Sequence, residues 1–264
     1  MSRSKRLYER AAAATGGLDP LWHVDHGLAF FAGPLHFNAS HQHSVPVYIA
    51  GLYAPFGLCI SDGRWQRCRA AVIPAATSYA LDVGGNPLAV LYLEPNVAGA
   101  DALMPLLRNT REVDGAVIGA SGETLLMREL YEARSAPKWA GAAMDDLLRF
   151  SQARSTRTLD PRVRRVVEEM HIRYDDRQPV ADVARSVGLS PSRFQHVFAA
   201  QVGVPFRRYR AWHRLRAAIG EIVRGSNFTT AAHAAGFADQ AHFAHDFRRT
   251  FGAAASRGLA RVRL

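Results

Sequence analysis

Residues 190–203 read SPSRFQHVFAAQVG, and residues 239–252 read DQAHFAHDFRRTFG, 49 positions later. In both stretches two phenylalanines stand four residues apart, and a glycine follows the second one five residues on. Phenylalanines at this spacing lie on one face of a helix and anchor it to a core, while the glycine suits the left-handed residue after a helix end. The repeat therefore predicts one helical motif that occurs twice in the chain.

A shorter helix ending in a turn is expected before each stretch. The chain has an alanine and a glycine four residues apart at 184–188 and again at 232–236. The small alanine lets two helices cross closely, and the glycine permits a positive φ in the tight turn between them. Ser190 and Asp239 stand at equivalent positions to cap the helices that follow. The pattern predicts two helix-turn-helix units.

Residues 205–224 carry apolar side chains at helical spacing and precede Gly225, so they are expected to form a long helix that joins the two units. Twenty residues extend about 30 Å, close to the ~34 Å between successive major-groove faces of a duplex. Such a spacer predicts that both units read adjacent turns of one DNA site. A scaffold helix is expected to begin at Asp160-Pro161, with a turn at 175–178 before the first unit.

The positive charge is concentrated in the segment that carries the repeat. Of the net charge of +10, residues 160–264 hold +9, from 18 arginines and 9 acidic residues, while residues 1–159 hold 15 basic and 14 acidic residues. The planar guanidinium group of arginine suits phosphate oxygens and guanine edges. Double-stranded DNA is therefore the expected partner, although arginines also serve simply to solvate helix faces.

The second helix of each predicted unit leaves a polar face outward, and helix-turn-helix proteins insert the first half of this helix into the major groove. Gln195 can form two hydrogen bonds with adenine, and His196 can bond a base or a phosphate. Any exposed helix shows a polar face, but the duplication favours DNA reading. The candidate DNA contacts are Ser192, Arg193, Gln195, His196, Arg208, Gln240, Ala241, His242, His245, Arg248 and Arg249.

Residues 183–194, VARSVGLSPSRF, and residues 236–243, GFADQAHF, resemble the two signature regions of the AraC-type bacterial transcription regulators. The resemblance covers about 100 of the 264 residues. It implies a double helix-turn-helix domain joined by a long helix. It also implies base-edge contacts from Ser192, Gln195 and His196 in the first unit, and from Ala241, His242 and His245 in the second.

Several residues depart from the family pattern. Arginine is frequent where His196 stands, and Ala231 replaces a large aliphatic residue. Ala255 and Gly258 replace the proline and the aromatic residue that normally follow the last Phe-Gly. An alanine in place of isoleucine removes buried methyl groups worth about 2 to 4 kcal/mol. We therefore expect the second unit to be less rigidly packed than the first, or to bind DNA with lower sequence specificity.

Between Leu18 and Leu93, short apolar runs are punctuated by glycine, proline and Asp-Gly turns, which is typical of a β-barrel or sandwich. Ahead of this DNA-binding domain, such a barrel resembles the cupin-like sensor of the same family, with His41-x-His43 among its usual landmarks. Metal-binding cupins have a further histidine where residues 77–79 read Thr-Ser-Tyr. A pocket for an organic effector is therefore favoured over a metal or cofactor, with metal sensing as the alternative. The expected pocket residues are His41, His43, Tyr48, Trp65 and Tyr79, with Phe56 and Tyr92 as further walls.

The predicted fold class is α+β: an N-terminal cupin-like β-barrel with following helices, and a C-terminal all-α domain of two helix-turn-helix units joined by a long helix. The expected domains are 1–105 for effector sensing, 106–159 for a helical linker or dimerisation region, and 160–264 for DNA binding. Helices are expected at 125–134 and 142–154. The second of these offers Met144, Leu147, Leu148 and Ser151 as a packing or dimerisation face.

The combined expectation is a sequence-specific transcriptional regulator, not an enzyme, controlled by an unidentified small molecule in the barrel. A homodimer is expected, and RNA polymerase is a further partner if the protein activates transcription. A metal-dependent cupin enzyme using His41 and His43 is the rival, and a regulator governed by a partner protein is the third alternative. A cytoplasmic location is expected, because no apolar run approaches a membrane span and residues 1–17 lack a signal-peptide core.

Overall fold

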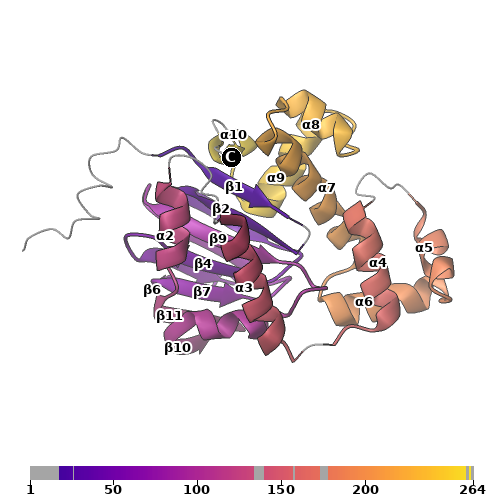
Figure 1. Ribbon diagram of the computed structural model, residues 1–264, viewed down its shortest axis with the longest axis horizontal. Helices are drawn as coiled ribbons and strands as arrows, with labels where there is room; N and C mark the ends of the chain where they lie inside the picture. Colours follow the sequence, from indigo (N-terminus) through magenta and orange to yellow (C-terminus); the bar gives the residue numbers. More distant parts are fainter. Residues whose placement is uncertain are drawn as a thin grey trace, which may run out of the picture.

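The computed structural model has a β-rich N-terminal half beside a helical C-terminal half (Figure 1). The expected absence of a signal core in residues 1–17 and most of the turn at 175–178 concern residues outside the described part of the chain. The structure describes residues 18–25, 27–133, 140–156, 158–172, 178–259 and 262.

A seven-stranded antiparallel sheet forms the centre of the N-terminal half. Its middle strands are buried on both faces, which explains the continuous apolar runs in their sequences. In spatial order the strands are β1 (Leu21–Val24), β2 (Leu28–Pro34), β9 (Pro87–Leu93), β4 (Val47–Gly51), β7 (Ala70–Ile73), β11 (Ala116–Gly122) and β10 (Leu107–Val113).

A four-stranded antiparallel sheet packs against one face of the large sheet. Side-chain alternation divides strand β4 between two cores: Val47 and Ile49 point toward the small sheet, whereas Tyr48 points to the opposite face. The N-terminal half is therefore a two-sheet sandwich. In spatial order the strands of the small sheet are β3 (Phe37–Gln42), β8 (Ser78–Asp82), β5 (Phe56–Ile60) and β6 (Gln66–Cys68).

Three helical segments cover the other face of the large sheet: η1 (Ala100–Leu106), α2 (Leu125–Glu132) and α3 (Ala140–Arg154) (Figure 1). Met144 and Leu147 of α3 join the core under these helices, and Ser151 is fully buried. Of the two readings of this helix face, packing within the chain is the one that the structure shows.

The large sheet continues past residue 105, where the sequence placed the end of the sensing domain. Strand β11 pairs with β7, and β10 pairs with β11 at the sheet edge. The sequence of β10, LRNTREV, is mostly exposed and has no apolar alternation, because an edge strand buries little of its surface. This strand was missed for that reason, and the α-helices begin only after Gly122, with α2 at Leu125.

The C-terminal helices begin and end close to the predicted positions. Ser190 caps its helix by accepting a hydrogen bond from the Arg193 N–H at 3.3 Å, and Asp239 does the same for the His242 N–H at 2.7 Å. The helices are α4 (Pro161–Ile172), α5 (Val180–Ser186), α6 (Pro191–Val202), α7 (Phe206–Val223), α8 (Phe228–Ala234), α9 (Gln240–Phe251) and α10 (Ala255–Leu259).

The repeated phenylalanines anchor both units as predicted. Phe194 and Phe198 are fully buried against Phe206 of α7, with ring centroids 5.1 Å from it in each case. Phe243 is fully buried beside Phe237, at 5.5 Å. Helix α7, at about 27 Å for its 18 residues, joins the two helix-turn-helix units, α5–α6 and α8–α9.

Candidate nucleic-acid interface and effector pocket

The exposed face of α6 carries the predicted contacts of the first unit. The anchoring phenylalanines turn the opposite side of the helix to solvent. Ser192, Arg193, Gln195 and His196 are all exposed. Hydrogen-bonding side chains in the first half of α6 are thus available to base edges, as the major-groove mode of this motif requires.

The corresponding residues of α9 are also exposed, but several already interact with neighbours. The Thr229 hydroxyl lies 3.0 Å from Oε1 of Gln240. Asp246 lies 3.7 Å from His242 and 3.3 Å from His245. The exposed residues of this face are Gln240, Ala241, His242, His245, Arg248 and Arg249. Arg208, at the start of α7, is only partly exposed.

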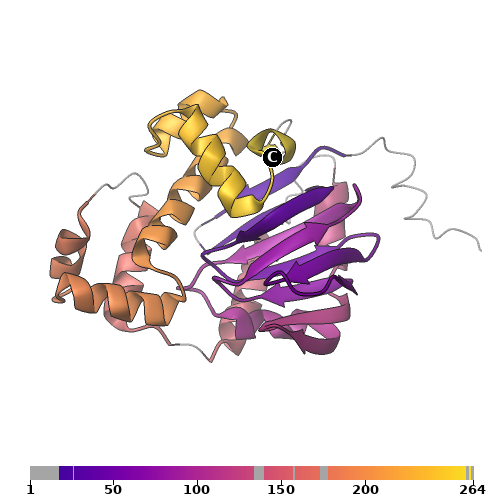
Figure 2. The same ribbon diagram turned by 180° about the vertical axis from the view of Figure 1, so that it is seen from behind.

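The end of α9 is docked on the sandwich. The Ala39 N–H donates to the carbonyl of Gly252 at 3.0 Å, and Nδ2 of Asn38 donates to the carbonyl of Phe251 at 2.8 Å. Strand β3 therefore satisfies carbonyl groups that a helix end leaves without partners. In Figure 2 the yellow helix α9 lies against the sandwich, and it does not run parallel to the orange helix α6.

Gly252 ends α9 in the left-handed conformation, with φ of 68°, as Gly203 ends α6 with φ of 91°. At Gly252 a Cβ atom would overlap the carbonyl oxygen of Ala39 and lie 2.6 Å from Nδ1 of His41. The sequence pattern explained the glycine at this position by its left-handed φ. The close approach of strand β3 is a second reason why only glycine fits here.

A pocket of about 590 Å³ lies between the sandwich and the end of α9. Aromatic and histidine rings from both halves form about half of its lining, to which the C-terminal half contributes Phe247, Phe251 and Arg257, among others. The sandwich contributes Trp22, Phe31, His36, Phe37, His41, His43, Tyr79 and Tyr92, among others.

The structure brings together three of the five residues predicted for the pocket, His41, His43 and Tyr79. Tyr48 lies on the opposite face of the large sheet, where its hydroxyl donates to the carbonyl of Glu123 at 2.8 Å. Trp65 is 51% exposed and packs on Phe37 outside the pocket. Neither position could be read from the sequence, because each depends on strand register. Of the two further walls proposed, Tyr92 lines the pocket and Phe56 is buried in the sandwich core.

The two histidines are held close together, and their burial favours the neutral form of each ring. Their ring centroids are 5.1 Å apart, as expected from alternation along the strand. Burial lowers the pKa of His41 to about 4, although the Ala39 carbonyl at 2.7 Å acts in the other direction. Burial also holds the pKa of His43 well below its usual value, helped by His41 and Arg208. Nδ1 of His43 is buried and has no hydrogen-bond partner among the described residues.

A fully buried carboxylate, Glu94, fixes α7 to the sandwich just after strand β9. Tyr209 Oη donates to one of its oxygens at 2.7 Å and Trp212 Nε1 to the other at 2.8 Å. Arg216 approaches to 3.5 Å. Burial alone would raise the pKa of Glu94, but Arg216 and His213 outweigh it and hold the pKa well below its usual value.

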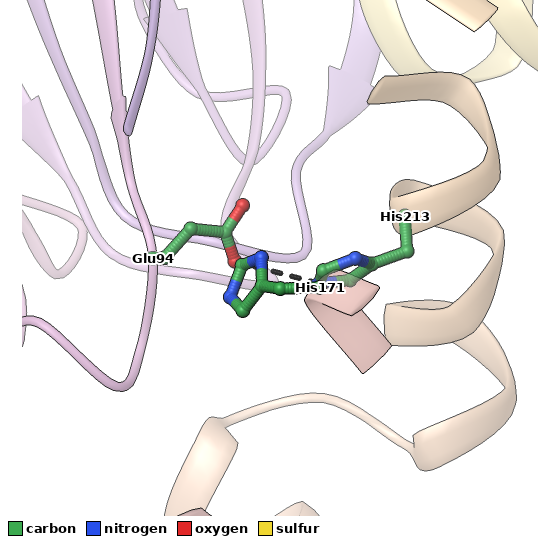
Figure 3. Close-up of side chains that lie close together, drawn as sticks. All are labelled: Glu94, His171 and His213. Carbon is green, nitrogen blue, oxygen red and sulfur yellow. Dashed lines mark ion pairs between the residues drawn. The ribbon is translucent and has the colours of Figure 1, made fainter. Parts of the chain in front are cut away.

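Glu94, His171 and His213 have donor atoms within 4.8 Å of one another, which is the donor set of a metal site (Figure 3). The guanidinium of Arg216 already supplies the positive charge, since it also lies 3.0 Å from Nδ1 of His171. We interpret the cluster as a charge pair that joins the two halves. Sequence reasoning missed it because Glu94 is a single acid 115 and 118 residues from its hydrogen-bond partners.

Trp212 connects this cluster to the pocket. Its ring centroid lies 5.3 Å from that of Tyr92 and 6.2 Å from that of Phe251, both of which line the pocket. Its Nε1 donates to Glu94. The wall of the pocket is therefore packed directly against a side chain of α7.

Residues 183–261 match the family model for a helix-turn-helix domain. No curated protein matches the chain significantly. Among solved structures, the chain is similar to ToxT of Vibrio cholerae. The apo form of a ToxT variant from strain SCE256, in which one lysine is replaced by alanine, is 12% identical, with a TM-score of 0.61 over 90% of this chain and 98% of that one.

Two further ToxT structures contain ligands. ToxT from strain SCE256 bound to an unsaturated fatty acid is 12% identical, with a TM-score of 0.54 over 94% of this chain and 96% of that one. ToxT from strain O395 bound to (E)-4-(8-methylnaphthalen-1-yl)but-3-enoic acid is 10% identical, with a TM-score of 0.56 over 88% and 98%. At these identities the likeness shows the fold.

None of the described helices is long and apolar enough to cross a bilayer.

The predicted α+β arrangement, with antiparallel sheets before a helical domain, is confirmed. Residues 183–261 form an AraC-type helix-turn-helix domain, and the chain is a DNA-binding transcription regulator that carries this domain after an N-terminal β-sandwich.

Proposed function

We propose that this regulator reads a specific DNA site with α6 and α9, and that an effector bound in the aromatic pocket controls how α9 is held. The observation that carries this proposal is the composition of the pocket wall. Phe247 and Phe251 belong to the second recognition helix, while His41, His43 and Tyr79 belong to the sandwich. A molecule in this pocket contacts both halves at once.

The pocket chemistry favours an effector with an apolar body and a polar or anionic end. Aromatic rings supply the apolar wall, and Nδ1 of His43 and the guanidinium of Arg257 supply polar groups. The ToxT ligands named above are a fatty acid and an aryl butenoic acid, both carboxylic acids with apolar bodies. These ligands support an amphipathic carboxylate as the effector class.

Control follows from differential affinity. The effector shifts the protein only if it binds the arrangement with α9 docked more tightly, or less tightly, than the arrangement with α9 released. Because α6 and α9 are not parallel when α9 is docked (Figure 2), we infer that DNA binding requires α9 to move. An effector that bridges the pocket walls then opposes DNA binding.

DNA reading is tested by genome-wide mapping of bound sites, followed by footprinting on the best site. Gln195→Ala should weaken that site by about 1 to 3 kcal/mol and leave unrelated DNA unaffected. Gln152→Ala, which removes an exposed glutamine of α3, is the matched control. An equal loss on all sequences would contradict base reading by Gln195.

Effector binding is tested with the full chain and a long-chain unsaturated fatty acid as the probe. Calorimetry should show saturable binding that Tyr79→Ala and His43→Phe weaken. Trp65→Ala should not weaken it, because Trp65 lies outside the pocket. If the probe and a screen of metabolites leave the protein unchanged, control by a partner protein replaces the small-molecule effector. Homodimer formation and contact with RNA polymerase remain predictions.

A further inference from the structure

A second groove, of about 520 Å³, lies where the sandwich meets α7 and α9. Gln42, the last residue of β3, and Ser44, just after it, form one wall. The first half of α7 and one side of α9 form the remaining walls. None of the residues that line this groove also lines the aromatic pocket. This volume is within the range of small-molecule sites.

The groove is strongly positive. Arg207, Arg208 and Arg249 line it together with His242. The one acid in its lining is Asp246, which already interacts with His242 at 3.7 Å. Burial lowers the pKa of Arg208, and the nearby charge of Arg249 lowers it further, so the two guanidinium groups repel each other. An anion between them would relieve this repulsion.

Further groups suit an oxyanion. Pro205, the residue before α7, also lines the groove, so the positive end of this helix dipole lies at its wall. Guanidinium groups bind phosphate oxygens through paired, charge-assisted hydrogen bonds. The Ser44 hydroxyl, which donates to the carbonyl of Arg208 at 3.2 Å, joins the sandwich to this helix start.

We propose that this groove is a binding site for the terminal phosphate group of a small phosphorylated metabolite, held by Arg207, Arg208 and Arg249. A terminal phosphate carries up to two negative charges, whereas each phosphodiester of the DNA backbone carries one. Because Gln42 and Ser44 form part of the wall, a small phosphate in the groove contacts the sandwich as well as α7 and α9. Such a ligand stabilises the docked arrangement and competes with DNA for the same arginines.

Calorimetry and thermal unfolding of the full chain with pyrophosphate, at constant ionic strength, test the site. We expect saturable one-to-one binding that Arg208→Gln and Arg249→Gln each weaken about tenfold or more. Arg67→Gln, an exposed arginine on β6, makes the same charge change away from the groove and should bind as the wild type does. Arg249→Lys keeps the charge and should restore part of the affinity.

A parallel titration with duplex DNA of unrelated sequence distinguishes a metabolite site from ordinary contact with the DNA backbone. Pyrophosphate binding with the expected variant pattern supports the metabolite site. Weakened duplex binding in the two groove variants without pyrophosphate binding overturns it, because the arginines then serve only the DNA backbone. Wild-type behaviour of both variants in both titrations, or equal losses in Arg67→Gln, overturns the proposal. Since neither titration uses the specific operator, the effector and base-reading proposals stand or fall separately.

Discussion

The two helix-turn-helix units are built from the same repeat but are held differently. A Cβ atom added to Gly203, at the end of α6, would lie 3.6 Å from Ala75 Cβ, its nearest neighbour. This distance is an ordinary van der Waals contact. At the end of α9, Gly252 is pressed against Ala39 and His41 of strand β3. The end of the first unit lies beside the sandwich at ordinary van der Waals distance. The end of the second unit is pressed against the sandwich and hydrogen-bonded to it.

This difference shows where control can enter. The aromatic pocket shares residues with α9 but none with α5 or α6. Under the proposed function, an effector in the pocket contacts the second unit directly, whereas its effect on the first unit passes through α7, which is anchored at Glu94. Four measurements test whether the two units differ in this way, and the one with the greatest predicted change comes first.

Glu94→Gln should affect both units alike, because it releases the helix that joins them. The change leaves the buried guanidinium of Arg216 without its carboxylate, and we expect a loss of about 3 to 5 kcal/mol in the free energy of unfolding, measured in urea. Glu221→Gln removes a partly exposed acid of α7 paired with Arg224 and should cost less than about 1 kcal/mol. Equal losses in the two variants would show that Glu94 contributes no more to stability than a partly exposed ion pair does.

Acid should weaken the structure through His41, which touches the second unit only. Its folded pKa of about 4 lies below the ordinary value of 6.5, so the unfolded chain takes up the proton first. Stability should be complete above pH 6.5 and should fall by about 3 kcal/mol toward pH 4.

His41→Gln removes this group, and its unfolding free energy should depend less on pH over this range. His196→Gln, at an exposed position of α6, should keep the wild-type pH profile. A profile that is unchanged in His41→Gln would show that His41 does not titrate with folding.

Gly252→Ala and Gly203→Ala form a matched pair. Both place a side chain in a left-handed residue, at a cost of about 1 to 2 kcal/mol. Only Gly252→Ala adds overlap with strand β3, for about 1 to 3 kcal/mol more. Amide hydrogen exchange should show β3 opening in the first variant but not in the second. Identical stability and exchange in the two variants would remove the docking role of Gly252.

The helix caps should behave alike in both units, since they are local. Ser190→Ala and Asp239→Ala each remove one hydrogen bond to a helix N–H, and each should lower the free energy of unfolding by about 1 kcal/mol. Thermal unfolding measures both. A much larger loss for Asp239→Ala would mean that the two units differ in their own folding and not only in docking.

The helical half of the molecule was predictable from short-range patterns. Phenylalanine spacing, N-caps and end glycines each act within one or two turns of a helix, so α5 to α9 begin and end near their expected residues. The sandwich was predicted only as a class. Strand β10 has no apolar alternation, and Tyr48 occupies the unexpected face, because both depend on pairing between distant strands.

Side-chain periodicity is a local property of a helix, so it was enough to place two helices with exposed polar faces, anchored by phenylalanines to a spacer. Long-range packing, in contrast, makes one of these helices close a pocket, presses Gly252 against β3 and brings Glu94 to α7. These contacts join residues more than 100 positions apart, and no local pattern encodes which distant surfaces pack together.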